Sequence, residues 1–398
     1  MPMPPNAVSV TLGVGSGPYQ KALAGNLLKL GMLRRVLTSG PSLLVQDPTA
    51  DGSLQTVEQF PITYWLNRIS WGVWRRIPPK VRPRPPIMAA TLLTDHLWSR
   101  RIPPCSIFHG WMGFSVACLS AARKQGTLTL VENPARHPGH WHKAGVEEGR
   151  RFGINPREYS PVLPDMLIRR INREYELCDR IAVPSSLSYR SFAEFGLAHK
   201  VAVVLPGVDT EFFRPAPLQE PRSLFRACFV GRVELAKGAG YLLQAWKRLA
   251  LPNAELVIVG GVKPDINSLL HECAGPSVRM MGSVKPDALA KIYRESDLFV
   301  FPSVNEGLAQ VILEAMASGL AVVGSDYSGA DDCVTEGKEG FIVPVRDVDR
   351  LAEAILWCYQ HRDETRAMGR EARARIENEF TLDHYSQRQI ALYLSMAA

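Results

Sequence analysis

The sequence predicts an α/β protein made of two Rossmann-like, doubly wound domains that face each other across a cleft. Three observations support this prediction. The chain has 398 residues, whereas a single hydrophobic core usually stops growing at roughly 250–300 residues. Short apolar strand patterns alternate with helical patterns in both halves, which indicates parallel sheets covered on both faces. A stretch rich in Pro and Gly, residues 205–221, separates the two halves.

The composition is that of a globular protein and excludes several other classes. Hydrophobic residues make up 46% of the chain and charged residues 21%, which argues against a disordered or fibrous protein. The sequence has no apolar run of about 18 residues and no cationic leader at its start, so neither a spanning helix nor a secretory signal is expected. The seven cysteines are scattered and never spaced as CxxC, which fits free thiols in the cytoplasm.

The N-terminal half is predicted to form one domain over residues 1–205. Its first strand, 8–14, precedes a helical pattern over 21–30, as expected for the start of a Rossmann-like fold. Further strands are predicted at 35–38, 106–109, 127–132, 179–184 and 201–205.

Glycines after the first strand leave two interpretations open. Gly13, Gly15 and Gly17 have the spacing of a turn that brings the backbone close to phosphate groups. A dinucleotide-binding domain would place an acidic residue about 20 residues later, but Arg34 and Arg35 occupy that region. Because arginines can hold a 2′-phosphate, an NADP-dependent oxidoreductase is kept as an alternative.

The second domain is predicted over 206–380 and repeats the βα pattern more regularly. Its strands are predicted at 227–231, 255–260, 277–281, 298–302 and 321–325. Helices are expected at 241–250, 286–295 and 308–318, and again after Asp349. The last residues, 381–398, are predicted to form a helix that packs back on the N-terminal domain.

The strongest chemical motif follows the buried strand 298–302. The chain there reads as a loop containing Glu306 and then a helix, so the free N–H groups of residues 307–310 should point out of the helix start. Together with the helix dipole, these amides would form an anion site suited to a pyrophosphate. Glu314 lies two turns further along and can accept hydrogen bonds from both hydroxyls of a ribose. An ordinary βα unit with surface glutamates is the structural alternative.

A second motif follows the strand 227–231. The strand ends at Gly231 and Arg232, and Lys237 comes five residues later, before the next helix. Ligands bind at the carboxyl ends of parallel strands in open α/β sheets. Arg232 could therefore grip a diphosphate with its fork while Lys237 adds a point charge. The alternative is a solvated loop.

Taken together, these motifs resemble the retaining glycosyltransferases of family 4, which have the GT-B architecture of two Rossmann-like domains. The E-x7-E element of the family matches at Glu306 and Glu314. The Gly-Arg…Lys-Gly element matches from Gly231 to Gly238, and Leu205-Pro206-Gly207-Val208-Asp209 is similar to the segment near the family's hinge. The resemblance is strong over 171–380 and much less extensive before 126.

The resemblance implies a role for each matching residue. Arg232 and Lys237 would stabilise the leaving diphosphate, helped by the backbone around Gly231 and by the amides of Gly307, Leu308 and Ala309. Glu306 would hold hydroxyls of the donor sugar and Glu314 the ribose. The segment ending at Val284 would read the nucleobase, and the turn with Gly15 and Gly17 would approach the diphosphate. The donor is a UDP- or GDP-linked sugar used as substrate, with no further cofactor.

Many family members place a histidine after the strand equivalent to 127–131, where it contacts the donor sugar. In this chain the strand runs into Glu132 and then His137, which looks like a variant spacing of that element. His137 is therefore the expected sugar contact, with a surface histidine as the alternative. His109, after the strand 106–109, is a second candidate on the acceptor side.

Metal ligation is not expected. Asp347 and Asp349 have the DxD spacing of metal-dependent glycosyltransferases, but they directly precede a predicted helix, where capping of the helix start is the better interpretation. The pair Asp331-Asp332 is interpreted as structural. In the absence of a carboxylate cluster in the sequence, we expect a metal-independent enzyme.

The charge of the chain is divided unevenly. Residues 1–200 hold 25 Lys and Arg against 13 Asp and Glu, although the whole chain has a net charge of only +7. A basic insert at 63–104 contains four of the tryptophans. Mixtures of Trp and Arg suit the membrane interface. We therefore expect docking on an anionic membrane surface and an anionic or lipid-linked glycan acceptor; no nucleic-acid module is recognised.

The sequence as a whole predicts a retaining hexosyltransferase that moves a sugar from a nucleoside diphosphate donor to an acceptor hydroxyl. The expected setting is synthesis of glycans, glycolipids or cell-surface polysaccharide, in the cytoplasm or on the inner face of the membrane. Two alternatives stay open: the NADP-dependent oxidoreductase and a catalytically silent protein that binds sugar nucleotides.

Overall fold

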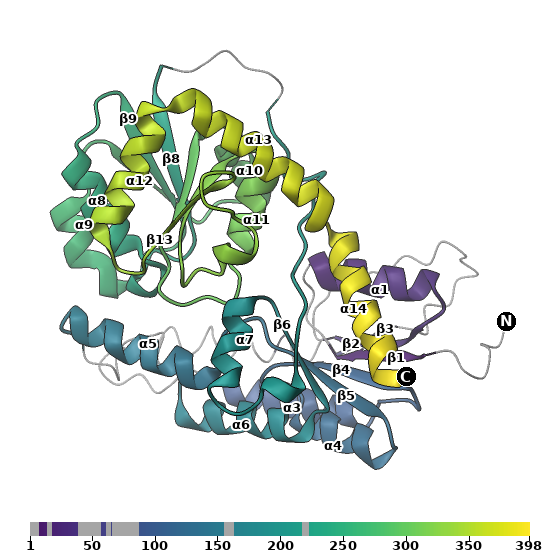
Figure 1. Ribbon diagram of the computed structural model, residues 1–398. Helices are drawn as coiled ribbons and strands as arrows, with labels where there is room; N and C mark the ends of the chain where they lie inside the picture. Colours follow the sequence, from purple (N-terminus) through teal and green to yellow (C-terminus); the bar gives the residue numbers. More distant parts are fainter. Residues whose placement is uncertain are drawn as a thin grey trace.

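Two parallel β-sheets, each flanked by helices, form the two domains of the protein (Figure 1). The computed structural model describes residues 8–13, 18–38, 57–60, 65, 87–154, 163–216 and 223–398. The strand order in each sheet confirms the predicted α/β fold with two doubly wound domains. Within the described ranges, no helix is long and apolar enough to cross a membrane.

The N-terminal sheet has seven parallel strands in the order β3-β2-β1-β4-β5-β6-β7. They are β1 (Val10–Gly13), β2 (Leu33–Thr38), β3 (Val57–Gln59), β4 (Ile107–Trp111), β5 (Leu128–Glu132), β6 (Arg180–Val183) and β7 (Val201–Val203). Strand β3 has no counterpart among the predicted strands, because three residues carry too little periodic pattern.

Helices cover both faces of this sheet. They are α1 (Pro18–Lys29), α3 (Ile87–Ser99), α4 (Val116–Lys124), α5 (Pro138–Arg151), α6 (Asp165–Leu177) and α7 (Ser186–Ala193), with a 3₁₀ turn at Ala198–Lys200. One core cluster joins α1 to the sheet, and the other joins α3, α4, α6 and α7 to the opposite face. Trp98 of α3 is buried in that second cluster. It is therefore a core residue and does not take part in the predicted membrane-facing insert, most of which lies outside the described residues.

The C-terminal sheet has six parallel strands in the order β10-β9-β8-β11-β12-β13. They are β8 (Phe225–Val230), β9 (Ala254–Val259), β10 (Val278–Gly282), β11 (Leu298–Phe301), β12 (Ala321–Ser325) and β13 (Gly340–Val343). The helices are α8 (Ala239–Leu249), α9 (Asn267–Cys273), α10 (Pro286–Arg294), α11 (Gln310–Ala317), α12 (Val348–Gln360), α13 (Arg362–Glu379) and α14 (Leu382–Ala397), with short 3₁₀ turns at Leu235–Lys237, Pro264–Ile266 and Ala330–Asp332.

The order of strands reverses between β1 and β4 in one sheet and between β8 and β11 in the other. A crevice forms outside the carboxyl ends of the strands at such a switch point, which is where open α/β sheets bind ligands. The carboxyl end of β8 leads to Arg232 and Lys237, and that of β11 leads to Glu306. The topology therefore brings the two predicted motifs to one edge of the sheet.

Helix α14 lies on the N-terminal domain beside α1 (Figure 1). Its Tyr385 and Tyr393 are buried in the same core cluster as α1. The chain thus crosses between the domains twice, and the crossings touch: Val208 N–H donates to Phe380 O at 2.8 Å. A Cβ atom at Gly207 would overlap the carbonyl of Thr381, so the close approach of the two crossings requires glycine there.

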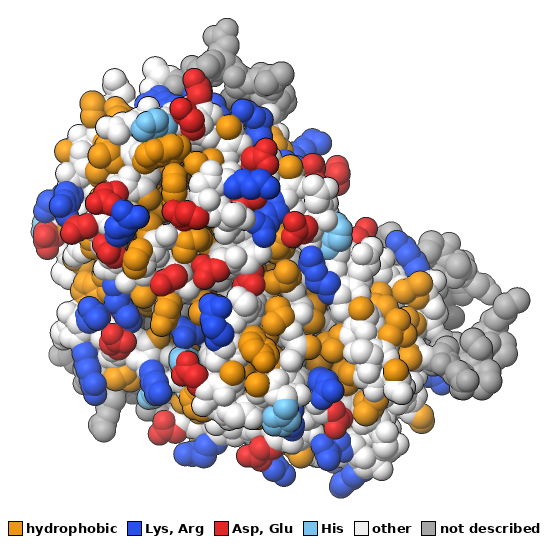
Figure 2. Space-filling model, viewed as in Figure 1, with side chains coloured by type: hydrophobic (Ala, Val, Ile, Leu, Met, Phe, Trp, Pro, Cys, Tyr) orange, Lys and Arg blue, Asp and Glu red, His pale blue; other side chains and the backbone are white. Residues whose placement is uncertain are grey.

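Acidic and basic side chains are interspersed over the face of the molecule seen in Figure 2. The excess positive charge of the first half is not collected into one uninterrupted patch on that face. On this face, the uneven charge of the two halves of the sequence therefore does not produce a single charged binding surface.

Candidate active site

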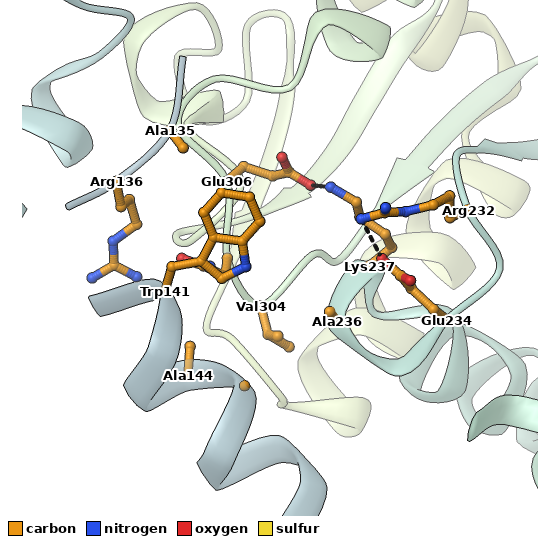
Figure 3. Close-up of a pocket in the computed structure, with 12 residues that line it drawn as sticks. Ala135, Arg136, Trp141, Ala144, Arg232, Glu234, Ala236, Lys237, Val304 and Glu306 are labelled. Atoms are coloured by element: carbon orange, nitrogen blue, oxygen red, sulfur yellow. Dashed lines mark hydrogen bonds and ion pairs between the residues drawn. The ribbon is translucent and has the colours of Figure 1, made fainter. Parts of the chain in front are cut away.

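A pocket of about 100 Å³ lies between the two domains (Figure 3). The C-terminal domain contributes seven residues: Arg232, Glu234, Ala236, Lys237, Val304, Asn305 and Glu306. The N-terminal domain contributes five: Ala135, Arg136, Trp141, Ala144 and Gly145. Three of the predicted site residues, Arg232, Lys237 and Glu306, therefore meet in one pocket.

The local backbone brings Lys237 close to the end of β11. After β8 the chain makes the 3₁₀ turn Leu235–Lys237, and Gly238 ends it in the left-handed region with φ of 74°. A Cβ atom at Gly238 would overlap the carbonyl of Pro302, which directly follows β11. Glycine is thus needed for the two loops to pack against each other, and this packing positions Lys237 next to Glu306.

Lys237 and Glu306 form an ion pair at the centre of the pocket. Ser303 Oγ also donates to Glu306 Oε1 at 3.1 Å, which fixes the carboxylate. Both charged side chains are largely but not fully buried, so a ligand can reach them. An anionic ligand would compete for Lys237 and would free Glu306 to accept hydrogen bonds from hydroxyl groups.

Arg232 extends into the same pocket and pairs with Glu234, with 2.9 Å between Nη2 and Oε1. The Arg232 side chain is 53% exposed, whereas Glu234 is fully buried, and this burial raises the pKa of Glu234. Glu234 was not among the predicted site residues. A carboxylate fixed behind Arg232 orients the guanidinium and leaves its other N–H groups free to bind an anion.

The N-terminal wall of the pocket holds two further residues that were not predicted, Arg136 and Trp141. In Figure 3 the indole of Trp141 lies between Arg136 and the Glu306–Lys237 pair. Arg136 is buried, its guanidinium lies 4.5 Å from the centre of the Tyr327 ring, and burial lowers its pKa. A flat indole facing a carboxylate and an ammonium offers a surface on which the apolar face of a sugar ring can pack.

His137 does not lie in this pocket, contrary to the role expected for it. The side chain is buried and accepts a hydrogen bond from Gly139 N–H at 3.1 Å, which makes it the N-cap of α5. Its ring stacks on Phe195 with 3.8 Å between ring centres. Burial lowers the pKa of His137 to about 4. The histidine therefore fixes the start of α5, which in turn carries Trp141.

The amides after Glu306 are only partly available. Ala309 N–H donates to Ser328 O at 3.2 Å, and α11 begins one residue later. Within the described part of the chain, the N–H groups of Gly307 and Leu308 have no acceptor. The predicted set of free amides over residues 307–310 is thus too large, because the loop before α11 packs against the loop after β12.

Gly307 also touches the other domain. Ser185 Oγ donates to Gly307 O at 2.8 Å. A Cβ atom at Gly307 would come within 2.5 Å of Pro134 O, so a larger residue would push the domains apart.

The remaining predicted residues lie outside this pocket. Glu314 of α11 accepts a hydrogen bond from Tyr293 Oη at 3.2 Å, and burial raises its pKa to about 7. Val284 follows β10 and packs against the C-terminal core. Gly15 and Gly17 lie outside the described residues.

The two aspartates with DxD spacing are used structurally. Asp347 accepts a hydrogen bond from Arg350 N–H at 2.9 Å and caps α12, as predicted. Asp349 forms an ion pair with Arg248. Asp332, also expected to be structural, accepts hydrogen bonds from Ser186 N–H at 3.0 Å and Ser186 Oγ at 3.1 Å across the domain contact.

Of the two arginines suggested as readers of a 2′-phosphate, Arg34 is exposed and Arg35 is already engaged. Arg35 pairs with Glu58 at 3.3 Å and donates to Arg101 O at 2.9 Å. These contacts hold β2 against β3 and the end of α3, and they weaken the case for an NADP-binding domain.

Comparison with known proteins finds similarity to glycosyltransferases. Residues 225–361 match the family model described as Glycosyl transferases group 1. Over 226 residues, the chain is 32% identical to a GDP-mannose-dependent alpha-(1-6)-phosphatidylinositol monomannoside mannosyltransferase of Mycobacterium tuberculosis. This alignment covers 52% of the chain and 59% of the relative. A phosphatidyl-myo-inositol mannosyltransferase of Mycolicibacterium smegmatis is 36% identical over 163 residues, covering 39% of the chain and 42% of that relative.

Solved structures resemble the chain over nearly its whole length. Sucrose-phosphate synthase from Thermosynechococcus elongatus matches with a TM-score of 0.71 at 19% identity, covering 98% of this chain and 99% of that one. Anabaena HepE in complex with UDP matches with a TM-score of 0.63 at 17% identity, covering 98% of this chain and all of that one. The fold is therefore GT-B, and most of the C-terminal domain matches the group 1 glycosyltransferases, which is consistent with the predicted resemblance to family-4 glycosyltransferases.

Proposed function

We propose that this chain is a glycosyltransferase that moves a hexose from a UDP- or GDP-linked donor to an acceptor hydroxyl, with retention of configuration. The observation that carries the proposal is the Lys237–Glu306 ion pair with Arg232 beside it, at the carboxyl ends of β8 and β11 and inside a pocket between two domains. Two cations and one carboxylate suit a ligand with both a diphosphate and a hydroxylated ring.

The two cations would act on the leaving group. As the bond between the sugar and the diphosphate breaks, negative charge grows on the diphosphate, and Lys237 and Arg232 stabilise it more strongly than they stabilise the intact donor. The free amides of Gly307 and Leu308, which directly follow Glu306 in the chain, would add two hydrogen-bond donors. Glu306, once Lys237 has turned to the phosphate, holds hydroxyls of the sugar. In this scheme the cations supply the charge that a metal ion supplies elsewhere, so the reaction is metal-independent.

The rest of the donor would extend over the C-terminal domain. Glu314 would accept hydrogen bonds from the ribose hydroxyls, and the segment at Val284, after β10, would contact the base. Names of relatives support an acceptor with several hydroxyl groups: two of them are called mannosyltransferases of phosphatidylinositol species. We place the reaction in glycolipid or cell-surface polysaccharide synthesis, in the cytoplasm or peripherally on the inner face of the membrane.

The experiment that tests the function has two stages. A thermal-shift screen with UDP, GDP, ADP and CMP identifies the nucleotide, because a ligand that binds only the folded state raises the melting temperature. Radiolabelled UDP- or GDP-sugars are then supplied with and without membrane extract, and both transfer and donor hydrolysis are measured. Lys237→Met and Glu306→Gln should each lower transfer by about 100-fold or more.

A matched control is Lys247→Met, because Lys247 is an exposed lysine of the same domain paired with Glu272. It should leave transfer unchanged. If the wild-type protein neither binds a nucleotide nor consumes any donor, or if the Lys237 and Glu306 variants keep full activity, the proposed function is wrong. Flotation with anionic liposomes at low salt separately tests the membrane association.

A further inference from the structure

We propose that Glu132 binds a hydroxyl of an uncharged, ring-sized acceptor, in a second pocket on the N-terminal side of the domain contact. The inference rests on the proposed function and adds the acceptor site and its substrate class. It depends on the shape and lining of this pocket, on the groups that hold Glu132, and on the charge around them.

The second pocket has a volume of about 130 Å³ and lies at the carboxyl ends of β5 and β6. It is next to Pro206, in the segment where the chain passes to the C-terminal domain. It is lined by Tyr19, Glu132, Asn133, Pro134, Ala182, Val183, Pro184, Val204, Pro206, Leu308 and Gln310. Asn133 and Pro134 belong to the same short segment as Ala135 and Arg136 of the first pocket. Only this segment, packed on Gly307, separates the two pockets.

Glu132 is the one charged residue in the described lining of this pocket, and its side chain is only 12% exposed. A buried carboxylate is costly unless other groups compensate it. Tyr385 Oη of α14 donates to Glu132, lying 3.1 Å from both carboxylate oxygens. His109 of β4 places Nε2 at 3.2 Å from Oε2.

A second tyrosine fixes His109 from behind. Tyr393 Oη lies 2.7 Å from His109 Nδ1. The imidazole of His109 is thus held beside Glu132, although its Nε2 makes no hydrogen bond to the carboxylate. Tyr385 donates to the carboxylate, which remains an acceptor with lone pairs left over. Glu132 lines the pocket, so a hydroxyl of a ligand bound there could donate a further hydrogen bond to the carboxylate.

A buried amide next to Glu132 adds a second polar contact. Asn133 is fully buried and lines the same pocket, and its Oδ1 has no hydrogen-bond partner among the described residues. Its Nδ2 donates to Ala135 O, which holds the amide in place. Glu132 and Asn133 could therefore grip two neighbouring hydroxyls of one ring.

The lining also indicates which acceptors fit. The described lining contains no Lys or Arg, and a carboxylate would repel a phosphate placed beside the bound hydroxyl. Three prolines, Val204 and Leu308 make the remaining walls apolar. A cavity of roughly 150 Å³ holds benzene, so this pocket has room for about one six-membered ring. The geometry therefore favours an uncharged cyclic polyol or glycoside over a phosphorylated acceptor.

Binding is tested with acceptor probes of known charge. Saturation-transfer NMR in the presence of the nucleotide that the thermal-shift screen selects compares neutral octyl pyranosides with the corresponding hexose 6-phosphates. The wild-type protein should bind at least one neutral probe and prefer it to its phosphate. Preference for the phosphates, or no binding of any neutral probe, would overturn the proposed acceptor class.

Catalysis is tested with Glu132→Gln, which keeps the shape of the side chain and removes its charge. Loss of one hydrogen bond to a charged group should lower acceptor-dependent transfer by about 10- to 100-fold. Donor hydrolysis without acceptor and the nucleotide-induced rise in melting temperature should stay at wild-type values. Undiminished transfer by Glu132→Gln would refute the role of Glu132 while leaving the proposed function intact, whereas loss of nucleotide binding in the wild type would refute the function itself.

Two variants distinguish a positioning role from a merely structural one. Both Tyr385→Phe and Tyr393→Phe keep the buried ring. The first removes the hydroxyl that donates to Glu132, and the second removes the hydroxyl that contacts His109. Each should raise the KM for the acceptor and leave the KM for the donor unchanged. Glu176→Gln, an exposed glutamate of the same domain paired with Arg173, is the matched control and should change neither. Equal effects on both KM values in the tyrosine variants would contradict a positioning role.

Discussion

At the scale of single residues, the proposed active site is held by pairs of opposite charges that form before any ligand arrives. Lys237 is paired with Glu306, and Arg232 with Glu234. Each pair keeps a cation in place at the end of a strand. The first pair lowers the cost of burying Lys237, and the second lowers the cost of burying Glu234. A diphosphate can replace Glu306 as the partner of Lys237, while Glu234 stays behind Arg232. The site is therefore organised in advance, which reduces the reorganisation needed during the reaction.

Glu314 leads to a prediction about pH. Burial raises its pKa to about 7, so the carboxyl group is mostly neutral at pH 6 and mostly ionised at pH 8. The ionised form accepts hydrogen bonds from both ribose hydroxyls, so nucleotide binding should favour it. The KM for the donor should consequently fall as the pH rises through about 7, measured as initial rates across that range. Glu314→Gln should bind the donor weakly, with a KM that no longer varies over this range; an unchanged pH profile in that variant would argue against the ribose contact.

The individual charged residues show what could be predicted from the sequence. Arg232, Lys237 and Glu306 follow apolar strands in a recognisable order, so their meeting at one edge was predictable. Trp141 and Glu234 were not, because neither belongs to a pattern of spacing. His137 was expected to contact the donor sugar, but it does not line this pocket and instead caps α5. Its position in the sequence does not determine where its side chain points after β5. The carboxylate at the end of that strand, Glu132, lines a pocket instead.

At the scale of secondary-structure elements, α14 completes the N-terminal domain although it follows the C-terminal domain in the chain. It packs beside α1 and contributes Tyr385 and Tyr393 to the core over β1 and β4. Thr381 caps its start by accepting from His384 N–H at 3.3 Å. Most strands and helices were predictable from periodicity, although β3 and β13 were not. The residues that α14 buries depend on contacts between ends of the chain far apart in sequence.

Removal of α14 should therefore destabilise the other end of the chain. Without residues 381–398, apolar side chains such as Leu12 and Leu23, which are fully buried, would face water. Burial of apolar surface is the main favourable term in folding. A chain ending at residue 380 should lose the thermal transition of the N-terminal domain or aggregate, as followed by circular dichroism and limited proteolysis. Deletion of Ala397 and Ala398 alone is the control and should keep the melting temperature; a normal transition in the longer deletion would contradict this assignment.

At the scale of the whole molecule, the two domains are held against each other by polar contacts on both sides of the pocket. On one side, Ser186 donates to Asp332 and Ser185 to Gly307. On the other, Glu148 of α5 is fully buried between two residues of the C-terminal domain. Tyr241 Oη donates to Glu148 Oε1 at 2.6 Å, and Arg346 Nε donates to Oε2 at 2.9 Å. The structure is thus a closed arrangement of the domains, in which residues of both line one pocket.

The contact between Glu148 and Arg346 should set the fraction of molecules in which the two domains are closed. Arg346 has a left-handed backbone, with φ of 68°, which is unusual for a residue with a side chain and is held here by its contacts. In Arg346→Met, closure would bury Glu148 without a cationic partner, and such a broken pair costs about 3–5 kcal/mol. Opening returns the carboxylate to water, so the equilibrium should shift toward the open form.

Small-angle X-ray scattering of Arg346→Met should then show a larger radius of gyration than for the wild type. The KM for the donor should rise by about 10-fold or more, because only the closed fraction binds productively, and saturating donor should restore the compact form. Arg350→Met removes an exposed arginine of the same domain, paired with Glu353 three residues further along, and should leave both measurements unchanged. An unaltered radius and KM in Arg346→Met would mean that other contacts across the domains set their closure.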